Sequence, residues 1–314
     1  MDWLASTLAS LAAQPVIGYA PAQSPATEPT ALAALALIAA GKARQAAPAL
    51  DFLASCQGSD GAVGIRHSEP SPGWPTGLAV LAWRAADDAS SRNAYAAHRR
   101  RAVDWILEAK GTAMPRSPEM GHDTQLVAWS WADKTHSWIE PTALNVLALK
   151  RAGLGTHARV REAIRLLVDR LLPVGGCNYG NTVVLGQTLR PHVQPTGLAM
   201  LALAGEVGPA CRAGPDQVSD RAARSRPAAG TYLERSLAYL QRSLIRPSTA
   251  MSGAWALLGL RAHGIELANG AELLAAAHRR VQAHDRSPHK LALLALAAQN
   301  NSLALLVSDR GRAG

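Results

Sequence analysis

We predict an all-α protein in which five to six pairs of helices form one domain spanning residues 1–314. Alanine and leucine dominate the sequence, and one Phe and five Tyr stand beside eight Trp, a composition typical of packed helices and poor for β-sheets. The other two observations are a repeated unit of helical length and an alternation of apolar with amphipathic helices. With 48% apolar residues, the chain has enough to bury a large core.

One sequence unit recurs at least four times along the chain. It reads Glu-Pro-Thr-Ala-Leu at 28–32 and 140–144, Trp-Pro-Thr-Gly-Leu at 74–78 and Gln-Pro-Thr-Gly-Leu at 194–198, with weaker copies at 252–260 and 288–296. Because proline at the first position of a helix loses no intrahelical hydrogen bond, each unit predicts a helix start. The prolines are 46, 66 and 54 residues apart, which leaves room for two helices and a variable loop in each interval.

A second, amphipathic helix is expected after each of these apolar ones, at 47–55, 97–109, 156–172, 233–244 and 271–284. Helices that are apolar all round must be buried, so the Pro-Thr series should form an inner layer and the amphipathic series an outer one. Four equivalent leucines should then lie in the core: Leu35, Leu81, Leu147 and Leu201.

The end of the chain indicates how the helix pairs are arranged. Segment 291–306 is as apolar as the interior copies and lacks the polar face of a terminal cap, so we expect the pairs to close into a ring of inner helices inside outer ones. Residues 206–230, rich in Pro, Gly, Arg and Asp, are expected to form a long surface loop, and 309–314 a frayed tail.

Location and partners are predicted from the apolar runs, the cysteines and the charge. The longest apolar stretches, such as 31–40, are shorter than the roughly 20 residues of a membrane span, and Asp2 stands where a signal peptide would be positive, so we predict a cytoplasmic protein. Cys56, Cys177 and Cys211 are too few for a disulfide framework, and buried reduced thiols are expected. The net charge is +9, and the arginines lie in short groups near the ends of predicted helices, so we predict no nucleic-acid partner. A peripheral contact with a membrane stays an open expectation.

The glycine-rich turns between paired helices carry a resemblance to a known family. Four residues of the first turn match the repeat of the squalene-hopene cyclase and protein prenyltransferase superfamily: Phe52, Leu53, Gln57 and Gly61. The repeat's Trp is replaced by Val63 here and by Cys177 in the third copy. Together with the Pro-Thr starts, the resemblance covers about residues 28–300. It implies a single α/α toroid that binds an isoprenoid chain in a central apolar cavity.

Neither catalytic motif of that superfamily is complete in this sequence. The Asp-x-Asp-Asp-Thr-Ala motif of the proton-initiated cyclases aligns with residues 138–143, where Glu140 alone is acidic. The zinc site of the prenyltransferases needs an Asp two residues before a Cys, and Cys177 has Gly175 in that place. We therefore predict no metal and no other cofactor. The resemblance also implies that a helical protein partner could complete the site.

The densest group of aromatic and titratable residues lies between 121 and 140, ahead of an inner helix. We expect five aromatic residues to bind substrate at the cavity mouth: Trp74, Trp129, Trp131, Trp138 and Tyr179. The predicted proton carriers are Asp123, His136 and Glu140. Tryptophans in such loops also plug barrel ends, and this alternative stays open.

Three functions remain open. The leading one is binding or conversion of an isoprenoid lipid, with any chemistry starting from an activated substrate such as an allylic diphosphate or an epoxide. The alternative is a non-catalytic toroid that binds a lipid or a protein partner. A carbohydrate-active α/α barrel with two carboxylates, drawn from Asp123, Asp133 and Glu140, is less favoured because the Pro-Thr repeats argue against it.

Overall fold

The computed structural model describes residues 2–90, 92–117, 119–206, 229–246 and 248–308. Within these residues the chain forms thirteen helices and one short β-hairpin, so the protein is all-α as its composition predicts. The expected tail at 309–314, and all but three residues of the loop expected at 206–230, lie outside the described residues. None of the described helices is both long enough and apolar enough to cross a membrane.

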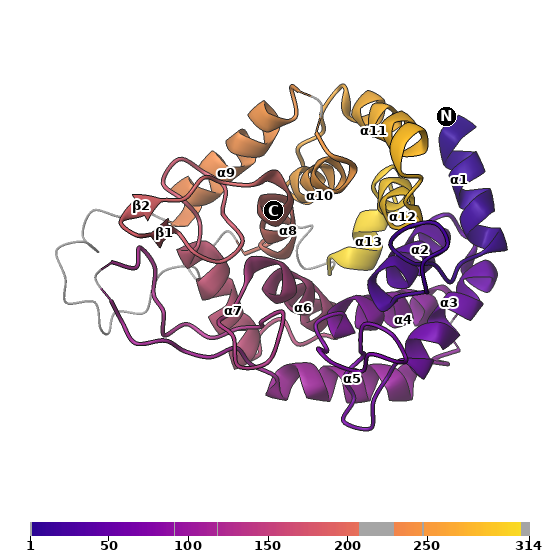
Figure 1. Cartoon of the computed structure of the whole chain (residues 1–314), viewed down its shortest axis with the longest axis horizontal. Coiled ribbons are helices and arrows are strands. Elements are labelled where there is room, and N and C mark those ends of the chain that lie inside the picture. Colours follow the sequence, from indigo (N-terminus) through magenta and orange to yellow (C-terminus); the bar gives the residue numbers. More distant parts are fainter. Residues whose placement is uncertain (1, 91, 118, 207–228, 247, 309–314) are drawn as a thin grey trace.

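Six helices, which we call the inner helices, begin at or beside a copy of the repeated unit. They are α2 (Thr27–Ala39), α4 (Thr76–Ser90), α6 (Ile139–Arg151), α8 (Val193–Ala202), α10 (Ala250–Arg261) and α12 (Pro288–Ala297). Each contacts the next, and α12 contacts α2, so the contacts run in a ring (Figure 1).

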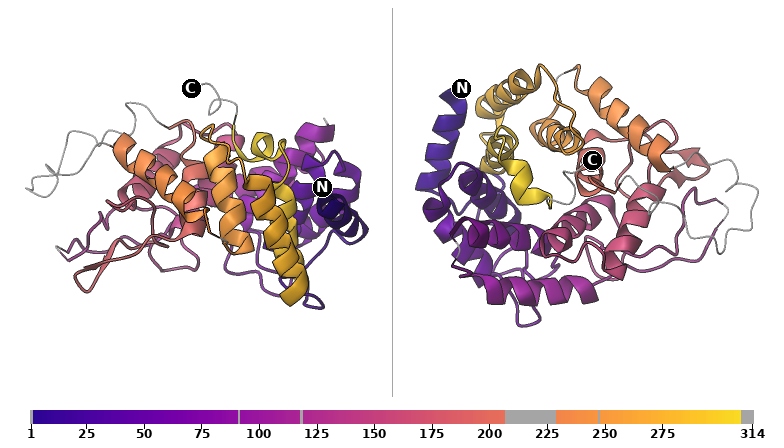
Figure 2. Two further views of the ribbon diagram at one scale, coloured as in Figure 1. Left: turned by 90° about the horizontal axis from the view of Figure 1, so that it is seen from above. Right: turned by 180° about the vertical axis from the view of Figure 1, so that it is seen from behind.

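Six further helices, the outer helices, pack around the inner ones (Figure 2). They are α1 (Asp2–Ala13), α3 (Ala43–Ser55), α5 (Ala96–Glu108), α7 (Ala158–Asp169), α9 (Ala229–Ser243) and α11 (Gly270–His284). The sequence pattern predicted all of them except α1. This helix buries Leu8 and Leu11 and contacts both α2 and α12, so it covers the seam between the first and last inner helices.

The apolar segment expected at 291–306 is divided into two helices. α12 ends at Ala297, and the five-residue α13 (Ser302–Leu306) follows a polar stretch in which Ser302 Oγ donates to the carbonyl of Gln299 at 2.7 Å. α13 contacts α2, α4 and α6, so the end of the described chain turns back over the ring (Figure 1).

The burial predicted for the inner helices is confirmed. The equivalent leucines Leu35, Leu81, Leu147 and Leu201 are at most 1% exposed. The outer helices bury one face each and leave the other to solvent, as their amphipathic pattern requires.

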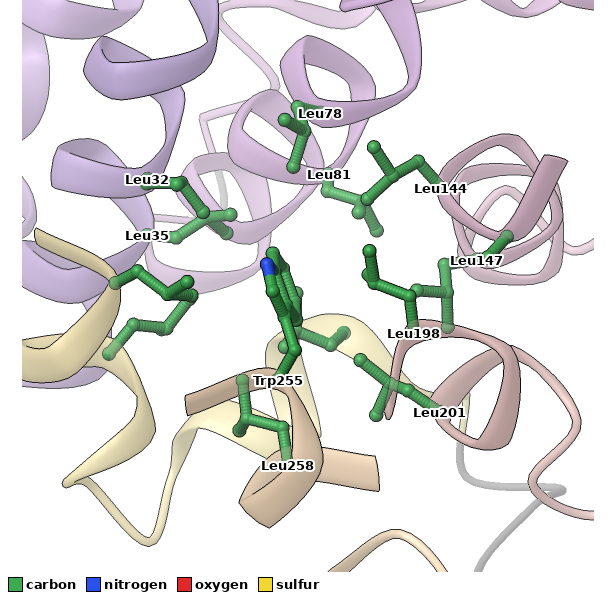
Figure 3. Packing of buried hydrophobic residues seen from close by; sticks show 14 of the residues in the cluster. Leu32, Leu35, Leu78, Leu81, Leu144, Leu147, Leu198, Leu201, Trp255 and Leu258 are labelled. Carbon is green, nitrogen blue, oxygen red and sulfur yellow. The ribbon is translucent and has the colours of Figure 1, made fainter. Parts of the chain in front are cut away.

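The centre of the ring is filled with side chains, in contrast to the central cavity that the resemblance implies. Figure 3 shows leucines from α2, α4, α6 and α8 meeting around Trp255 of α10, and none of the labelled side chains exceeds 4% exposure. If these side chains lined a cavity large enough for a lipid, part of their surface would remain accessible to water. A void of about 10 Å³ lies instead at the edge of the core, beside Leu257 and Leu274, and has room for one water molecule.

All six inner helices begin at the same end of the ring, because an outer helix running the opposite way separates each from the next. We call this the N-terminal end of the ring. Three of the connections that arrive there are long, at 56–75, 109–138 and 170–192, and the third contains the hairpin of β1 (Val183–Val184) and β2 (Gln187–Thr188). Figure 2 shows the hairpin projecting beyond the helices.

Candidate functional site

Four neighbouring inner helices carry an equivalent residue immediately before the repeat's proline, at the N-terminal end of the ring. These residues are Glu28, Trp74, Glu140 and Gln194. The Nε2 of Gln194 donates to Oε1 of Glu140 at 2.8 Å, although 54 residues separate them. The charge of Glu28 also acts on Glu140. The repeat therefore brings carboxyl, amide and indole groups to one end of the ring.

Glu140 is the carboxyl group in this cluster with the most unusual environment. It is 6% exposed, and burial raises its pKa to about 7, with the hydrogen bond from Gln194 opposing the rise and the charge of Glu28 adding to it. A carboxyl group with this pKa is present in both protonation states near neutral pH. It is therefore able to donate or accept a proton.

A second cluster surrounds Glu28 at the seam of the ring and was missed by the sequence analysis. Oε1 of Glu28 lies 3.4 Å from Nε2 of His289, and the ring of Tyr19 meets the His289 ring edge-on at 5.0 Å. Burial and the neighbouring Glu28 carboxylate hold the pKa of Tyr19 far above its usual value. The shared position of Glu28 and Glu140 in the repeat was the available signal.

The structure brings several of the expected aromatic residues together in pairs. The rings of Trp74 and Trp131 meet edge to face at 4.6 Å, and both are half-buried. Tyr179, 38% exposed, lies 5.0 Å from the ring of His192, and its carbonyl accepts from the amide of Ile139 at the start of α6. Tyr179 lies close to Glu140, because burial and then the charge of Glu140 raise the pKa of Tyr179.

Trp129, expected at the rim, is instead part of the core. It is 2% exposed, its Nε1 donates to the carbonyl of Ile106 at 2.8 Å, and the guanidinium of Arg159 lies 4.8 Å above its ring. Because the indole is covered on all sides, it cannot contact a ligand at the mouth. Trp129 is therefore part of the packing that joins this loop to α5.

The other two expected proton carriers have different surroundings. Asp123 lies in the loop that packs on the β-hairpin, where its carboxylate accepts from the amide of Gln125 and lies 3.7 Å from Arg116. The ring of His136 lies 4.4 Å from the ring of Trp138 and is tilted by 32° to it, and burial, with a contribution from Arg170, lowers the pKa of His136. His136 is therefore neutral at physiological pH and serves better as a hydrogen-bonding group than as an acid.

The two cysteines in the described part of the chain, Cys56 and Cys177, are buried thiols. Cys177 is fully buried, and burial raises the pKa of its thiol to about 12, so the thiolate is scarce at neutral pH. Cys56 is also buried with a raised pKa, and Cys211 lies outside the described residues. Within the described ranges, no three His, Cys, Asp or Glu side chains are grouped as a metal ion requires.

Comparison with known proteins found no match, either to a family model or to a curated protein. The chemistry at the N-terminal end of the ring is therefore what bears on function. It combines apolar aromatic faces, one carboxyl group that titrates near neutrality and a neutral imidazole.

Proposed function

We propose that the chain is an α/α toroid that binds an isoprenoid or similarly apolar ligand at the N-terminal end of its ring, as a binding protein without turnover. The supporting observation is that the centre is packed with leucine, while the paired Trp74 and Trp131 and the buried Glu140 with its hydrogen bond from Gln194 lie at this end. The cyclic contacts of six inner helices support the toroid, and the half-buried Trp74 and Trp131 provide apolar faces for a ligand.

The test is equilibrium binding of labelled farnesol to the full chain, preceded by native mass spectrometry for an apolar molecule that copurifies. Trp131→Ala removes one face of the edge-to-face pair and should weaken farnesol binding about tenfold, the value of an aromatic contact. Trp3→Ala is the matched control, because Trp3 is also half-buried but packs on His278 in the outer layer. Farnesol binding that is absent, or equally weakened by both variants, would overturn the proposal.

A second candidate, proton transfer on an activated isoprenoid, is favoured by one observation. The buried Glu140 has a pKa of about 7 and a fixed hydrogen bond from Gln194, so it is held in place as a general acid or base. An allylic diphosphate or an epoxide would be the substrate, since a single carboxyl group is too weak to protonate an unactivated alkene. Turnover of such a substrate that is lost in Glu140→Gln, with farnesol binding retained, would establish this function over the first.

A further inference from the structure

Among the described residues, the exposed large apolar side chains are concentrated at one end of the ring. Six large hydrophobic residues of the described chain are exposed: Met114, Val174, Tyr179, Val184, Leu185 and Ile245. All lie in connections that lead from an outer helix to an inner helix, within 109–138, 170–192 and 244–249. In the described connections at the opposite end of the ring, no large hydrophobic side chain is exposed. Folding alone does not explain this asymmetry.

The tip of the β-hairpin is the most exposed of these positions. Leu185 is 95% exposed and has a φ of +50°, followed by Gly186 at +73°. Two-residue hairpin turns with these angles normally carry Asn, Asp or Gly, because a bulky side chain is strained in the left-handed region. A leucine here neither packs on the protein nor suits the turn. A strained and exposed leucine of this kind points to contact with a binding partner rather than to a role in folding.

The hairpin is held firmly enough to present this leucine. β1 pairs with β2, and the amide of Leu189 donates to the carbonyl of Thr182 at 2.8 Å. Oγ1 of Thr182 in turn lies 3.0 Å from Nδ1 of His122, in the neighbouring loop that carries Met114. The hairpin and this loop therefore project from the molecule together, as the side view in Figure 2 shows.

The charges nearest the hairpin tip and Ile245 are positive, whereas the loop that carries Met114 holds exposed residues of both signs, among them Arg116 and Glu119. Segments 171–192 and 244–249 hold five of the six exposed hydrophobic residues, and their charged side chains are Arg190 and Arg246, both exposed, with no carboxylate. A surface of apolar tips flanked by arginine is complementary to an anionic lipid bilayer.

We propose that the N-terminal end of the ring binds an anionic membrane, with Val184 and Leu185 inserted among the acyl chains and Arg190 and Arg246 at the level of the phosphates. The apolar side chains stand on separate loop tips, and a soft bilayer accommodates such tips without the complementary surface that a protein partner would need. The half-exposed Tyr179 suits the membrane interface, where aromatic residues with a polar end are enriched. The proposal does not depend on which ligand the ring binds.

The test is cosedimentation of the full chain with vesicles of phosphatidylcholine, alone or with one quarter phosphatidylglycerol. The wild type should bind the anionic vesicles more strongly. Leu185→Asn should lower that binding about tenfold or more, because burying a leucine side chain accounts for at least that factor. Asn suits the left-handed turn, so this variant keeps the hairpin. Equal sedimentation of the two proteins, or no binding of the wild type to either vesicle, would overturn the proposal.

Two further variants separate the charge from the apolar tip. Arg190→Gln should lower binding to anionic vesicles about fivefold and leave binding to neutral vesicles unchanged, whereas Arg92→Gln, the same charge change at the opposite end, should alter neither. The tryptophan fluorescence of Leu185→Trp should be quenched by brominated acyl chains more than that of the wild type, which has eight tryptophans of its own. Equal quenching of the two proteins would contradict insertion. If the wild type dimerises in the ultracentrifuge, Leu185→Asn is monomeric and vesicles are not bound, the tip is a contact between copies and the membrane proposal is wrong.

Discussion

The threonine of each Pro-Thr unit joins its inner helix to the loop that precedes it. Oγ1 of Thr142 accepts from the amide of Trp129 and donates to the carbonyl of the same residue, both at 3.3 Å. Thr30 makes the same pair of contacts with Ile17, at 3.2 and 3.0 Å. Thr76 and Thr196 accept from the amides of the equivalent loop residues. The repeated threonine is therefore explained by structure.

Thr142→Val should destabilise the protein by about 1–3 kcal/mol, because it leaves the buried amide of Trp129 without a hydrogen-bond partner. The free energy of unfolding in urea measures the loss. Thr188→Val, the same change at an exposed position of the hairpin, should stay within about 0.5 kcal/mol of the wild type. Equal losses of unfolding free energy in the two variants would show that the hydrogen bonds between Thr142 and Trp129 contribute nothing to stability.

Glu140 should make the stability of the protein depend on pH. Its pKa is raised from 4.5 to about 7 in the folded state, so folding favours the protonated form and stability is lost as the pH rises through this range. At 1.4 kcal/mol per pH unit, the loss is at most about 3 kcal/mol. Glu140→Gln should therefore be more stable than the wild type at pH 8 and show no advantage at pH 4. If the variant and the wild type differ in unfolding free energy by the same amount at pH 4 and at pH 8, the pKa of Glu140 is not raised by folding.

At the scale of elements, the residues that carry the family resemblance tie one outer helix to the next. After α3, Oε1 of Gln57 accepts from Nδ1 of His98 and from Arg101 in α5, at 2.7 and 2.6 Å. Gly61, with a φ of +97°, passes so close to α5 that a Cβ there would lie 2.3 Å from the carbonyl oxygen of Arg101. In the third copy, Gly175 approaches the carbonyl oxygen of Arg235 in α9 in the same way, at 2.2 Å.

Gly61→Ala should cost about 3 kcal/mol or more in unfolding free energy, because the new methyl group forces the turn away from α5. The matched control is Gly41→Ala. Gly41 also has a positive φ, of +73°, but a Cβ there would meet nothing within 4 Å, so only the left-handed strain of about 1 kcal/mol applies. If the two variants lose the same stability, the turn does not dock on α5 as the structure has it.

At the scale of the whole molecule, the ring depends on its filled centre and on its seam. Trp255 of α10 lies among leucines of the other inner helices (Figure 3), and α12 meets α2 where α1 covers the junction. The C-terminal α13 adds contacts with α2, α4 and α6. The first and last elements of the described chain therefore act together to complete one body.

Trp255→Ala should destabilise the protein by about 3–5 kcal/mol, because it removes the indole that fills the centre and leaves a cavity. Thermal or urea unfolding measures the loss, and Trp131→Ala, a half-buried tryptophan at the end of the ring, should lose clearly less. A Trp255→Ala variant that keeps wild-type stability would mean that the centre is open space and not a packed core.

The sequence by itself determined the helical fold, the positions of most helices and which series is buried. These are local properties: a Pro-Thr start and an apolar period predict a helix without reference to the rest of the chain. The same logic predicted Glu140 as a titratable group at the start of an inner helix, and it lies in the first turn of α6. It missed α1, whose role at the seam depends on the far end of the chain meeting the near end.

Only the tertiary structure decided what fills the ring and which side chains meet at its end. Whether six apolar helices surround a cavity depends on the summed volume of their inward side chains, and Trp255 with the leucines uses that space. The burial of Trp129 and the pairing of Glu140 with Gln194 depend on contacts between residues 23 and 54 positions apart. The repeat places Glu140 and Gln194 at equivalent positions, but which side chains touch is set by how the elements pack together.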